Sequence, residues 1–322
     1  MAEIDDQRKR DTRTSSIGRC IASCISVFLT QFTLALIPRF LYTSPLLIQL
    51  ALSALVLVVV LGLGGRCRRV LGVSASAPAF VVLSIIYIWA IYVTVVREAI
   101  PLFRDILFHG EVAMLIIGFC SDRFHADDRA YNYSIFKRDP GRVTPGPSLS
   151  SELCEGSISE VSETISLMGR VRYCRSCEAY IKGFDHHCPA FGNCIGQNNY
   201  LLFMALLAGF LITESSFVAC SSKFASKSSI LYQTGLESSI AADLVIGGLL
   251  FSLLQLLWQG IFFMWHIYCI CFNIRTDEWI NWKKYPEFQH QVKSEQGQSS
   301  TSLTFRNPYD KGILGNIRDF LS

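Results

Sequence analysis

Residues 182–203, KGFDHHCPAFGNCIGQNNYLLF, bring together side chains that bind metals and side chains that act as nucleophiles. His186, His187 and Cys188 are consecutive, Cys194 follows them, and Cys174-x-x-Cys177 lies just upstream. Zinc prefers thiolate and imidazole ligands in a tetrahedron, and a CxxC turn supplies two of its four ligands. The spacing therefore predicts a closed structural zinc site beside a candidate cysteine nucleophile.

Several side chains compete for the two ligand positions beside the CxxC pair. The candidates are His186, His187, Cys188, Cys194 and, more remotely, Cys154. A zinc-bound thiolate is a poorer nucleophile than one off the metal, so a reactive Cys188 should stay off the zinc. Adjacent residues project in different directions, so one histidine can bind metal while the other serves Cys188. A thioredoxin-like redox CxxC is the alternative, but it requires a βαβ context that the sequence does not show.

A reactive cysteine needs help, because a thiol with an ordinary pKa is only a few per cent ionised at neutral pH. His186 lies beside Cys188 and can act as its base, while Asp185 can fix the imidazole tautomer, as in a catalytic triad. General-base catalysis of this kind contributes ~10²–10⁴-fold. The segment thus predicts Cys188 as nucleophile, His186 as base and Asp185 as its orienting carboxylate.

Long apolar segments must position this chemistry. The chain has 322 residues, of which 51% are hydrophobic, which indicates an integral membrane protein. Its net charge of +3 is too small to favour nucleic acid as a partner. A helix needs about 20 apolar residues to cross the bilayer. The predicted spans are residues 20–37, 45–63, 78–96, 102–120, 201–220 and 244–271.

The fourth of these segments decides the topology. Arginine and lysine residues cluster before the first span, including Arg19, and after the second, including Arg66, so both places are predicted to be cytosolic. If residues 102–120 return across the membrane, the cysteine-rich segment also lies in the cytosol, where thiols stay reduced. Four polar residues interrupt that segment: Arg104, Asp105, His109 and Glu111. The alternative is that residues 102–111 lie in the interface and only a short or re-entrant segment enters.

These elements predict an α-helical polytopic membrane protein with about six transmembrane helices and a small zinc domain between the fourth and fifth. No cleavage pattern follows the first apolar run, so we expect a span there rather than a signal peptide. The expected regions are a cytosolic N-terminus (1–19), four spans (20–120), a flexible linker (121–170), the zinc domain (171–200), two spans (201–271) and a cytosolic tail (272–322).

The tetrapeptide Asp185-His186-His187-Cys188, followed by Pro189, Asn193-Cys194-Ile195-Gly196 and Asn198, resembles the DHHC cysteine-rich domain of the protein S-acyltransferases, or palmitoyltransferases. Three flanking elements are similar to that family as well: Asp139-Pro140-Gly141, Thr276-Asp277-Glu278, and Asn307-Pro308-Tyr309-Asp310 with Asn316. The resemblance covers about residues 120–322. The two extra spans at the front have counterparts in six-span members.

The resemblance implies that Cys174, Cys177, His187 and Cys194 bind zinc, leaving His186 and Asp185 to serve Cys188. The family usually carries a second zinc site, but its positions here hold Glu160, Glu163, Tyr173 and Tyr180. We therefore expect one zinc per chain, with the two tyrosines packed where the other metal would lie.

The family's chemistry is transfer of a long-chain fatty acyl group, such as palmitoyl, from acyl-CoA through the active cysteine to cysteines of cytosol-facing substrate proteins. Arg175 and Lys182, with Arg170 and Arg172 nearby, are candidates to meet CoA phosphates; the alternative is a solvated basic face beside acidic lipid. The implied location is the endomembrane system (Golgi, endoplasmic reticulum or plasma membrane), with the catalytic domain in the cytosol.

Outside the tetrapeptide, Thr276 is expected to contact the catalytic region, although Arg275 and Ala190 depart from the family's usual threonine and tryptophan. Asn316 is expected to hold the tail against the last helices by bonding backbone groups. Glu214 and His266, inside predicted spans, are expected to be buried hydrogen-bond partners. Two other functions compete: a non-catalytic zinc-knuckle membrane adaptor and a membrane thiol oxidoreductase.

Overall fold

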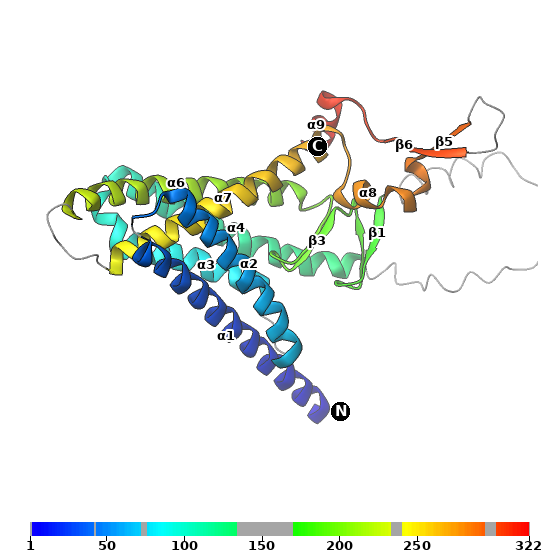
Figure 1. Ribbon diagram of the computed structural model, residues 1–322. Coiled ribbons are helices and arrows are strands. Elements are labelled where there is room, and N and C mark those ends of the chain that lie inside the picture. The colour runs from blue at the N-terminus through cyan, green and yellow to red at the C-terminus, as the bar shows by residue number, and fades with distance from the viewer. Residues whose placement is uncertain are drawn as a thin grey trace, which may run out of the picture. The chain divides into compact units, whose positions relative to one another are not determined.

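The computed structural model describes residues 2–41, 43–71, 76–133, 170–232, 240–293 and 301–321 (Figure 1). The predicted linker, Asp139-Pro140-Gly141, Cys154, Glu160 and Glu163 lie outside these residues. The chain divides into two compact units. The first comprises Met1–Phe119, Pro189–Phe191 and Ala205–Met264, and the second comprises Cys120–Cys188, Gly192–Met204 and Trp265–Ser322.

Six long helices coincide with the six predicted apolar segments. They are α1 (Ala2–Phe40), α2 (Leu46–Leu71), α3 (Ala77–Ile91), α4 (Leu102–Tyr133), α6 (Tyr200–Tyr232) and α7 (Ile240–Cys271). A π-helical turn, η1 (Tyr92–Val96), and a 3₁₀ turn, η2 (Arg97–Ala99), extend α3. The prediction of an α-helical membrane protein is confirmed.

Within the residues that the structure describes, four stretches are long and apolar enough to cross a membrane: Ile17–Phe40, Ala77–Ala99, Tyr200–Ser226 and Ile240–Cys271. The apolar part of α2, Leu46–Val60, is shorter than a full crossing, and α4 is not among these stretches. Charged residues near the start of α4, including Asp105 and Glu111, lower its suitability for hydrocarbon. The count of six spans therefore stays a prediction.

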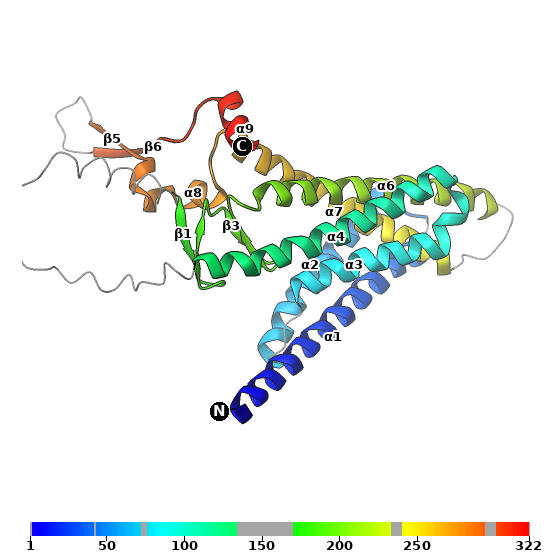
Figure 2. The same ribbon diagram turned by 180° about the vertical axis from the view of Figure 1, so that it is seen from behind.

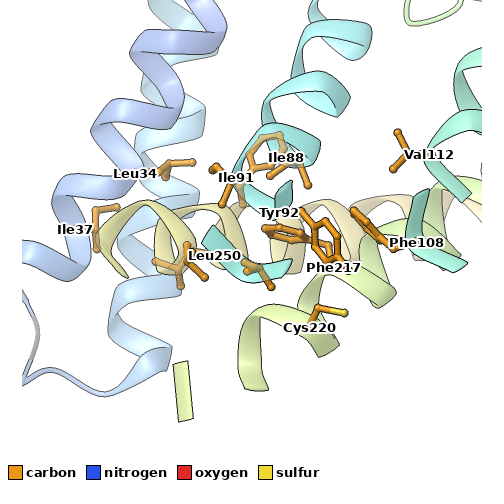
Figure 3. Packing of buried hydrophobic residues seen from close by; sticks show 13 residues of the cluster. Leu34, Ile37, Ile88, Ile91, Tyr92, Phe108, Val112, Phe217, Cys220 and Leu250 are labelled. Carbon is orange, nitrogen blue, oxygen red and sulfur yellow. The ribbon is translucent and has the colours of Figure 1, made fainter. Parts of the chain in front are cut away.

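The first unit is held together by an apolar cluster that draws on helices far apart in the sequence (Figure 3). Its members recur at intervals of three or four residues, which place them on one face of each helix. The labelled members are Leu34, Ile37, Ile88, Ile91, Tyr92, Phe108, Val112, Phe217, Cys220 and Leu250. Cys220 is buried among these apolar side chains, as a free cysteine that behaves as a small hydrophobe.

Helices α1 and α7 approach closely within this unit because a glycine lies at their contact. A side chain at Gly247 would come within 2.9 Å of the Ala35 backbone. Small residues of this kind let transmembrane helices pack backbone to backbone. Arg39 on α1 also forms an ion pair with Asp243 on α7, at 3.2 Å.

The second unit contains the cysteine-rich segment, folded as two short antiparallel hairpins. Strand β1 (Val171–Cys174) pairs with β2 (Ala179–Lys182), and β3 (His186–Cys188) pairs with β4 (Asn193–Ile195). Between the hairpins, Gly183 has a positive φ of 60°, and a side chain there would come within 2.8 Å of Gln197. Only glycine fits such a turn without strain.

The rest of this unit follows α7. Helix α8 (Thr276–Asn281) leads through the 3₁₀ turns η4 (Trp282–Lys284) and η5 (Pro286–Phe288) to the hairpin of β5 (Gln289–Lys293) and β6 (Thr301–Phe305), and then to α9 (Ile313–Leu321). Strands β1 and β3 and helix α8 lie together in both views (Figures 1 and 2).

Candidate active site

Four side chains from the two hairpins converge at one point. They are Cys174, Cys177, His187 and Cys194, whose candidate ligand atoms all lie within 4.8 Å of one another. Cys174 ends β1 and Cys177 lies in the turn that follows, so the CxxC pair approaches from one hairpin. His187 and Cys194 are direct partners across β3 and β4, and paired residues project from the same face of a hairpin.

The spacing of these atoms fits a tetrahedral zinc ion. With Zn–S near 2.3 Å and Zn–N near 2.0–2.1 Å, ligand atoms should lie roughly 3.4–3.8 Å apart. His187 Nδ1 lies 3.8 Å from Cys174 Sγ, 3.3 Å from Cys177 Sγ and 3.7 Å from Cys194 Sγ. The sulfurs of Cys177 and Cys194 are 3.3 Å apart. The four side chains therefore suit the zinc that the sequence predicts.

The charges of this cluster also favour a cation. Burial raises the pKa of the Cys177 thiol, and burial together with the neighbouring thiols Cys174 and Cys177 raises that of Cys194. Burial, followed by the charge of His186, lowers the pKa of His187 and keeps this imidazole neutral. Neutral imidazole is the form that binds metal, and a bound divalent cation offsets the repulsion among thiolates.

The alternation of β3 separates the metal from the candidate nucleophile. Successive side chains of a strand point to opposite faces, so His186 and Cys188 share one face and His187 takes the other. Cys188 is buried, with 6% of its surface exposed, and hydrogen-bonds the imidazole of His186. It does not belong to the four-residue cluster. Strand geometry thus groups His187 with the three cysteines and sets Cys188 apart from them, a distinction that the residue spacing alone left open.

His186 is held from its other side by Asp185. Its Nδ1 lies 2.7 Å from Asp185 Oδ2, so Nε2 is the nitrogen that can serve the thiol. Burial lowers the pKa of His186, but the hydrogen bonds and charges of Asp185 and Cys188 raise it by more, to about 9. The arrangement therefore favours an imidazolium at neutral pH, the partner that stabilises a thiolate.

The Asp185 carboxylate is completely buried and tied to the start of α8. Its Oδ1 accepts the backbone N–H of Thr276 at 2.9 Å, and its carbonyl accepts that of Asp277 at 3.0 Å. Burial raises the pKa of Asp185, but the hydrogen bond and charge of His186 and the Thr276 N–H lower it below its ordinary value. The expected contact between Thr276 and the catalytic region is present, and it is made by the backbone.

Asp185, His186 and His266 form a second group of potential ligands within 4.8 Å. The 2.7 Å separation of His186 Nδ1 from Asp185 Oδ2 is that of a charge-assisted hydrogen bond. It is shorter than the roughly 3.3 Å expected between two ligands of one tetrahedral metal. This group is therefore a hydrogen-bonded cluster.

Two arginines that the sequence offered for CoA phosphates are engaged elsewhere. Arg170 forms an ion pair with Glu278 at 2.9 Å, and Arg172 forms one with Glu287 at 2.7 Å. The Arg170 pair is nearly buried, with exposed side-chain fractions of 13% and 2%. Arg170 therefore serves the fold and not a phosphate, contrary to that expectation. Arg175 and Lys182 are exposed, and their role towards CoA stays a prediction.

The C-terminal tail is fastened as the sequence predicts. Asn316 is buried, and its side chain donates to the carbonyl of Cys271 at 2.8 Å and accepts the backbone N–H of Lys311 at 2.8 Å. The carbonyl of Tyr309 accepts a hydrogen bond from Asn273 at 3.1 Å. The expected packing of Tyr173 on Tyr180 is also confirmed, since their ring centroids are 5.0 Å apart.

Sequence reasoning found His266 but not its neighbourhood. The expectation of a buried hydrogen-bond partner is confirmed, because Tyr200 Oη and His266 Nδ1 are 2.9 Å apart and His266 is fully buried. The structure also places His266 beside Asp185, at 3.9 Å. A histidine near the C-terminal end of a predicted span, a few residues before Thr276, was the available signal.

Comparison with known proteins agrees with this geometry. Residues 161–283 match the model of the DHHC palmitoyltransferase family. The chain is 27% identical over 212 residues to the mouse protein named Palmitoyltransferase ZDHHC17, covering 59% of this chain and 31% of that protein. It is 30% identical over 152 residues to Probable protein S-acyltransferase 1 of Arabidopsis thaliana, covering 47% and 38%.

A third relative, Probable protein S-acyltransferase 13 of Arabidopsis thaliana, is 36% identical over 108 residues, covering 28% of this chain and 35% of that protein. The chain thus spans about a third of the length of the curated relatives it matches. The family match includes helix α8 and both hairpins, and the hairpins carry the candidate nucleophile and the candidate metal ligands. Residues 161–283 are thus similar to the DHHC palmitoyltransferase family.

Proposed function

We propose that this protein is a membrane-bound S-acyltransferase that moves a long-chain acyl group, such as palmitoyl, from acyl-CoA through Cys188 to cysteines of substrate proteins. The observation that carries the proposal is the division of labour along β3. His186 and Cys188 share one face of the strand. His187 lies on the opposite face, in the cluster with Cys174, Cys177 and Cys194. The thiol is thereby kept reactive next to a built metal site.

In the first step, the Cys188 thiolate attacks the thioester carbonyl carbon of acyl-CoA, and the bond from that carbon to the CoA sulfur breaks. The departing CoA thiolate takes a proton from the His186 imidazolium. In the second step, His186 accepts the proton of a substrate thiol, whose sulfur attacks the acyl-Cys188 thioester and releases the Cys188 thiolate. One thioester replaces another at each step, so the protein supplies proton transfer and orientation.

Asp185 holds His186 in the productive orientation throughout. Its Oδ2 fixes the Nδ1 proton, so the Nε2 side faces the reacting sulfur. The N–H groups at the start of α8 fix Asp185 in turn, with bonds of 2.9 Å and 3.0 Å. Donors on a rigid helix end keep such a carboxylate from rotating.

The apolar helices explain why this chemistry belongs at a membrane. Each buried CH₂ of an acyl chain contributes about 0.8 kcal/mol, so the chain favours an apolar environment over water. Tyr200 begins α6 shortly after Cys188, and Tyr200–Ser226 is apolar enough to span the bilayer. We place the hairpins at the cytosolic face of a six-span endomembrane protein, with cytosol-facing proteins as substrates.

A single zinc ion held by Cys174, Cys177, His187 and Cys194 would fix the two hairpins together. Its chemistry is structural, because four protein ligands leave no open coordination position. Arg175 and Lys182, both exposed, are the residues we assign to CoA phosphates.

The test is autoacylation of the purified full chain in detergent. Labelled palmitoyl-CoA should give a hydroxylamine-sensitive label on the wild type and none on Cys188→Ser. The matched control is Cys20→Ser, which alters an exposed cysteine of the first unit and should keep the label. Zinc content should be unchanged in both variants. A wild type that takes no label would favour a non-catalytic adaptor, and a label that persists in Cys188→Ser would remove Cys188 from its role.

A further inference from the structure

A second histidine lies directly behind the proposed catalytic pair. His266, near the end of α7, is fully buried and has no part in the two steps described above. Its Nδ1 lies 3.9 Å from Asp185 Oδ2, the same oxygen that bonds His186. The Asp185 carboxylate is therefore flanked by two imidazoles, and His186 is the one that we assign to Cys188, to which it is hydrogen-bonded.

The His266 ring is fixed from several sides. Tyr200 Oη lies 2.9 Å from Nδ1, and the Arg275 guanidinium sits over the Tyr200 ring at 4.7 Å. The Phe203 ring meets the imidazoles of His186 and His266 edge to face, with centroid separations of 5.7 Å and 5.0 Å. Because these contacts restrict its motion, the His266 ring forms a rigid surface (the wall) against the Asp185 carboxylate.

The arrangement of the two imidazoles shows which motion this wall would oppose. Their ring centroids are 5.6 Å apart, and Asp185 Oδ1 is already bonded to the Thr276 N–H. A rotation of the Asp185 carboxylate about its Cβ–Cγ bond would break the bond from Oδ2 to His186 Nδ1. We infer that the His266 ring, beside Oδ2, opposes this rotation. Loss of that bond would let the His186 ring turn away from Cys188.

We propose that His266 is a positioning residue for acyl transfer, acting through Asp185 to keep His186 directed at Cys188. The inference rests on the proposed function. His266 presents a polar nitrogen to a buried carboxylate and to the Tyr200 hydroxyl at once, which an apolar side chain of the same size cannot do. Because we assign His266 a role that acts through Asp185, its effect should fall on the rate of acyl transfer rather than on acyl-CoA binding.

The experiment compares His266→Phe, His266→Asn and His266→Ala in the full chain. Phenylalanine keeps the ring shape without a polar atom, whereas asparagine can place a polar atom near the position of Nδ1. The expected maximal autoacylation rate falls roughly 10–100-fold in His266→Phe and His266→Ala, the range seen when groups that orient reactive ligands are removed. His266→Asn should recover much of the rate, with the KM for palmitoyl-CoA unchanged in all three. His290→Ala, at an exposed histidine of β5, is the matched control and should be fully active.

Zinc content and thermal unfolding show whether each variant is folded. Tyr200→Phe provides a second test if the His266 variants unfold, because it keeps the ring and removes only the hydroxyl that bonds His266. We expect this variant to be slowed as well. A wild-type maximal rate in a folded His266→Phe variant would overturn the inference. If the His266 variants unfold, a wild-type maximal rate in Tyr200→Phe would overturn it. So would a rise in KM alone, or an asparagine variant as slow as His266→Ala.

Alkylation of Cys188 by iodoacetamide, followed by peptide mass spectrometry, separates this inference from the proposed function. The reaction reports the thiolate that His186 supports and requires no acyl transfer. Slower alkylation in His266→Phe than in wild type would support positioning even if palmitoyl-CoA gave no label. Equal alkylation rates would overturn it even if the wild type took the label.

Discussion

The second unit is fastened at two places by different chemistry. The zinc cluster, as we name the candidate metal ligands Cys174, Cys177, His187 and Cys194, brings the hairpins together through thiols and an imidazole that suit a metal ion. The arginine clamp, formed by Arg170 with Asn273, Glu278 and Tyr309, joins the residue before β1 to the segment after α7 without any ion. We expect the zinc cluster to hold the hairpins only when metal is bound, whereas the arginine clamp forms whenever the chain is folded.

The arginine clamp is complete in itself. Arg170 hydrogen-bonds the side chain and carbonyl of Asn273, pairs with Glu278 and lies 3.8 Å over the Tyr309 ring. Burial raises the pKa of Glu278 and lowers that of Arg170, and the attraction between the two offsets only part of each shift. Such a pair is costly to assemble and still more costly to break, because removing one partner strands the other charge.

Zinc removal should produce the largest effect. Structural zinc contributes about 10–16 kcal/mol in small zinc domains, far more than the arginine clamp can replace. Chelation, or Cys177→Ala, should therefore unfold residues 171–200 while the clamp residues remain present. Limited proteolysis with zinc analysis measures this, with Cys120→Ser, at an exposed cysteine, as the control. Resistance of the zinc-free hairpins to protease would show that the clamp suffices.

Arg170→Ala should have the second largest effect. It should lower the unfolding free energy by about 3–5 kcal/mol, because it leaves Glu278 buried without its cation. Zinc binding should survive. Arg172→Ala is the matched control: its pair with Glu287 is more exposed, at 21% and 32%, and should cost only about 0–1 kcal/mol. Denaturant unfolding in zinc-containing buffer compares the two. Equal losses would mean that the clamp is no stronger than a surface pair.

Tyr180→Ala should have a smaller effect on stability. It tests whether tyrosine packing takes the place of a second metal beside the zinc cluster. The Tyr173–Tyr180 contact is worth about 0.5–1.5 kcal/mol beyond its buried area. Because we assign these tyrosines to packing in place of a second metal, zinc should stay at one ion per chain in both wild type and variant. A second zinc in the wild type would contradict that assignment.

Stability should also depend on pH. The pKa of His186 is raised from its ordinary value near 6.5 to about 9, so its stabilising contribution is complete below about pH 6.5 and is lost as pH rises through about 9. Wild-type protein should therefore melt at a lower temperature at pH 10 than at pH 7. His186→Gln should show less of this loss, and an equal loss in both would assign it to another group.

The sequence could predict the zinc cluster and the Asp185–His186–Cys188 group because their members lie close together along the chain. It could not predict the arginine clamp, because Arg170 and Glu278 are 108 residues apart and each alone reads as an ordinary surface charge. The contact of His266 with Asp185 was equally hidden, since it depends on how α7 ends beside the hairpins. The positions of the long helices could be predicted from the lengths of the apolar segments. Whether α2 and α4 cross the membrane could not, because it depends on where a few charged residues lie.

The pairing of β3 with β4 sets His187 opposite Cys194, and Cys188 opposite Asn193. Odd and even positions of one three-residue strand therefore carry separate tasks, and a substitution at 186 or 188 leaves the other face untouched. Under the proposed function, variants at 186 or 188 should lose autoacylation while keeping their fold and their metal content. A single inserted residue between His187 and Cys188 would instead move Cys188 to the face opposite His186 and separate the proposed nucleophile from its base.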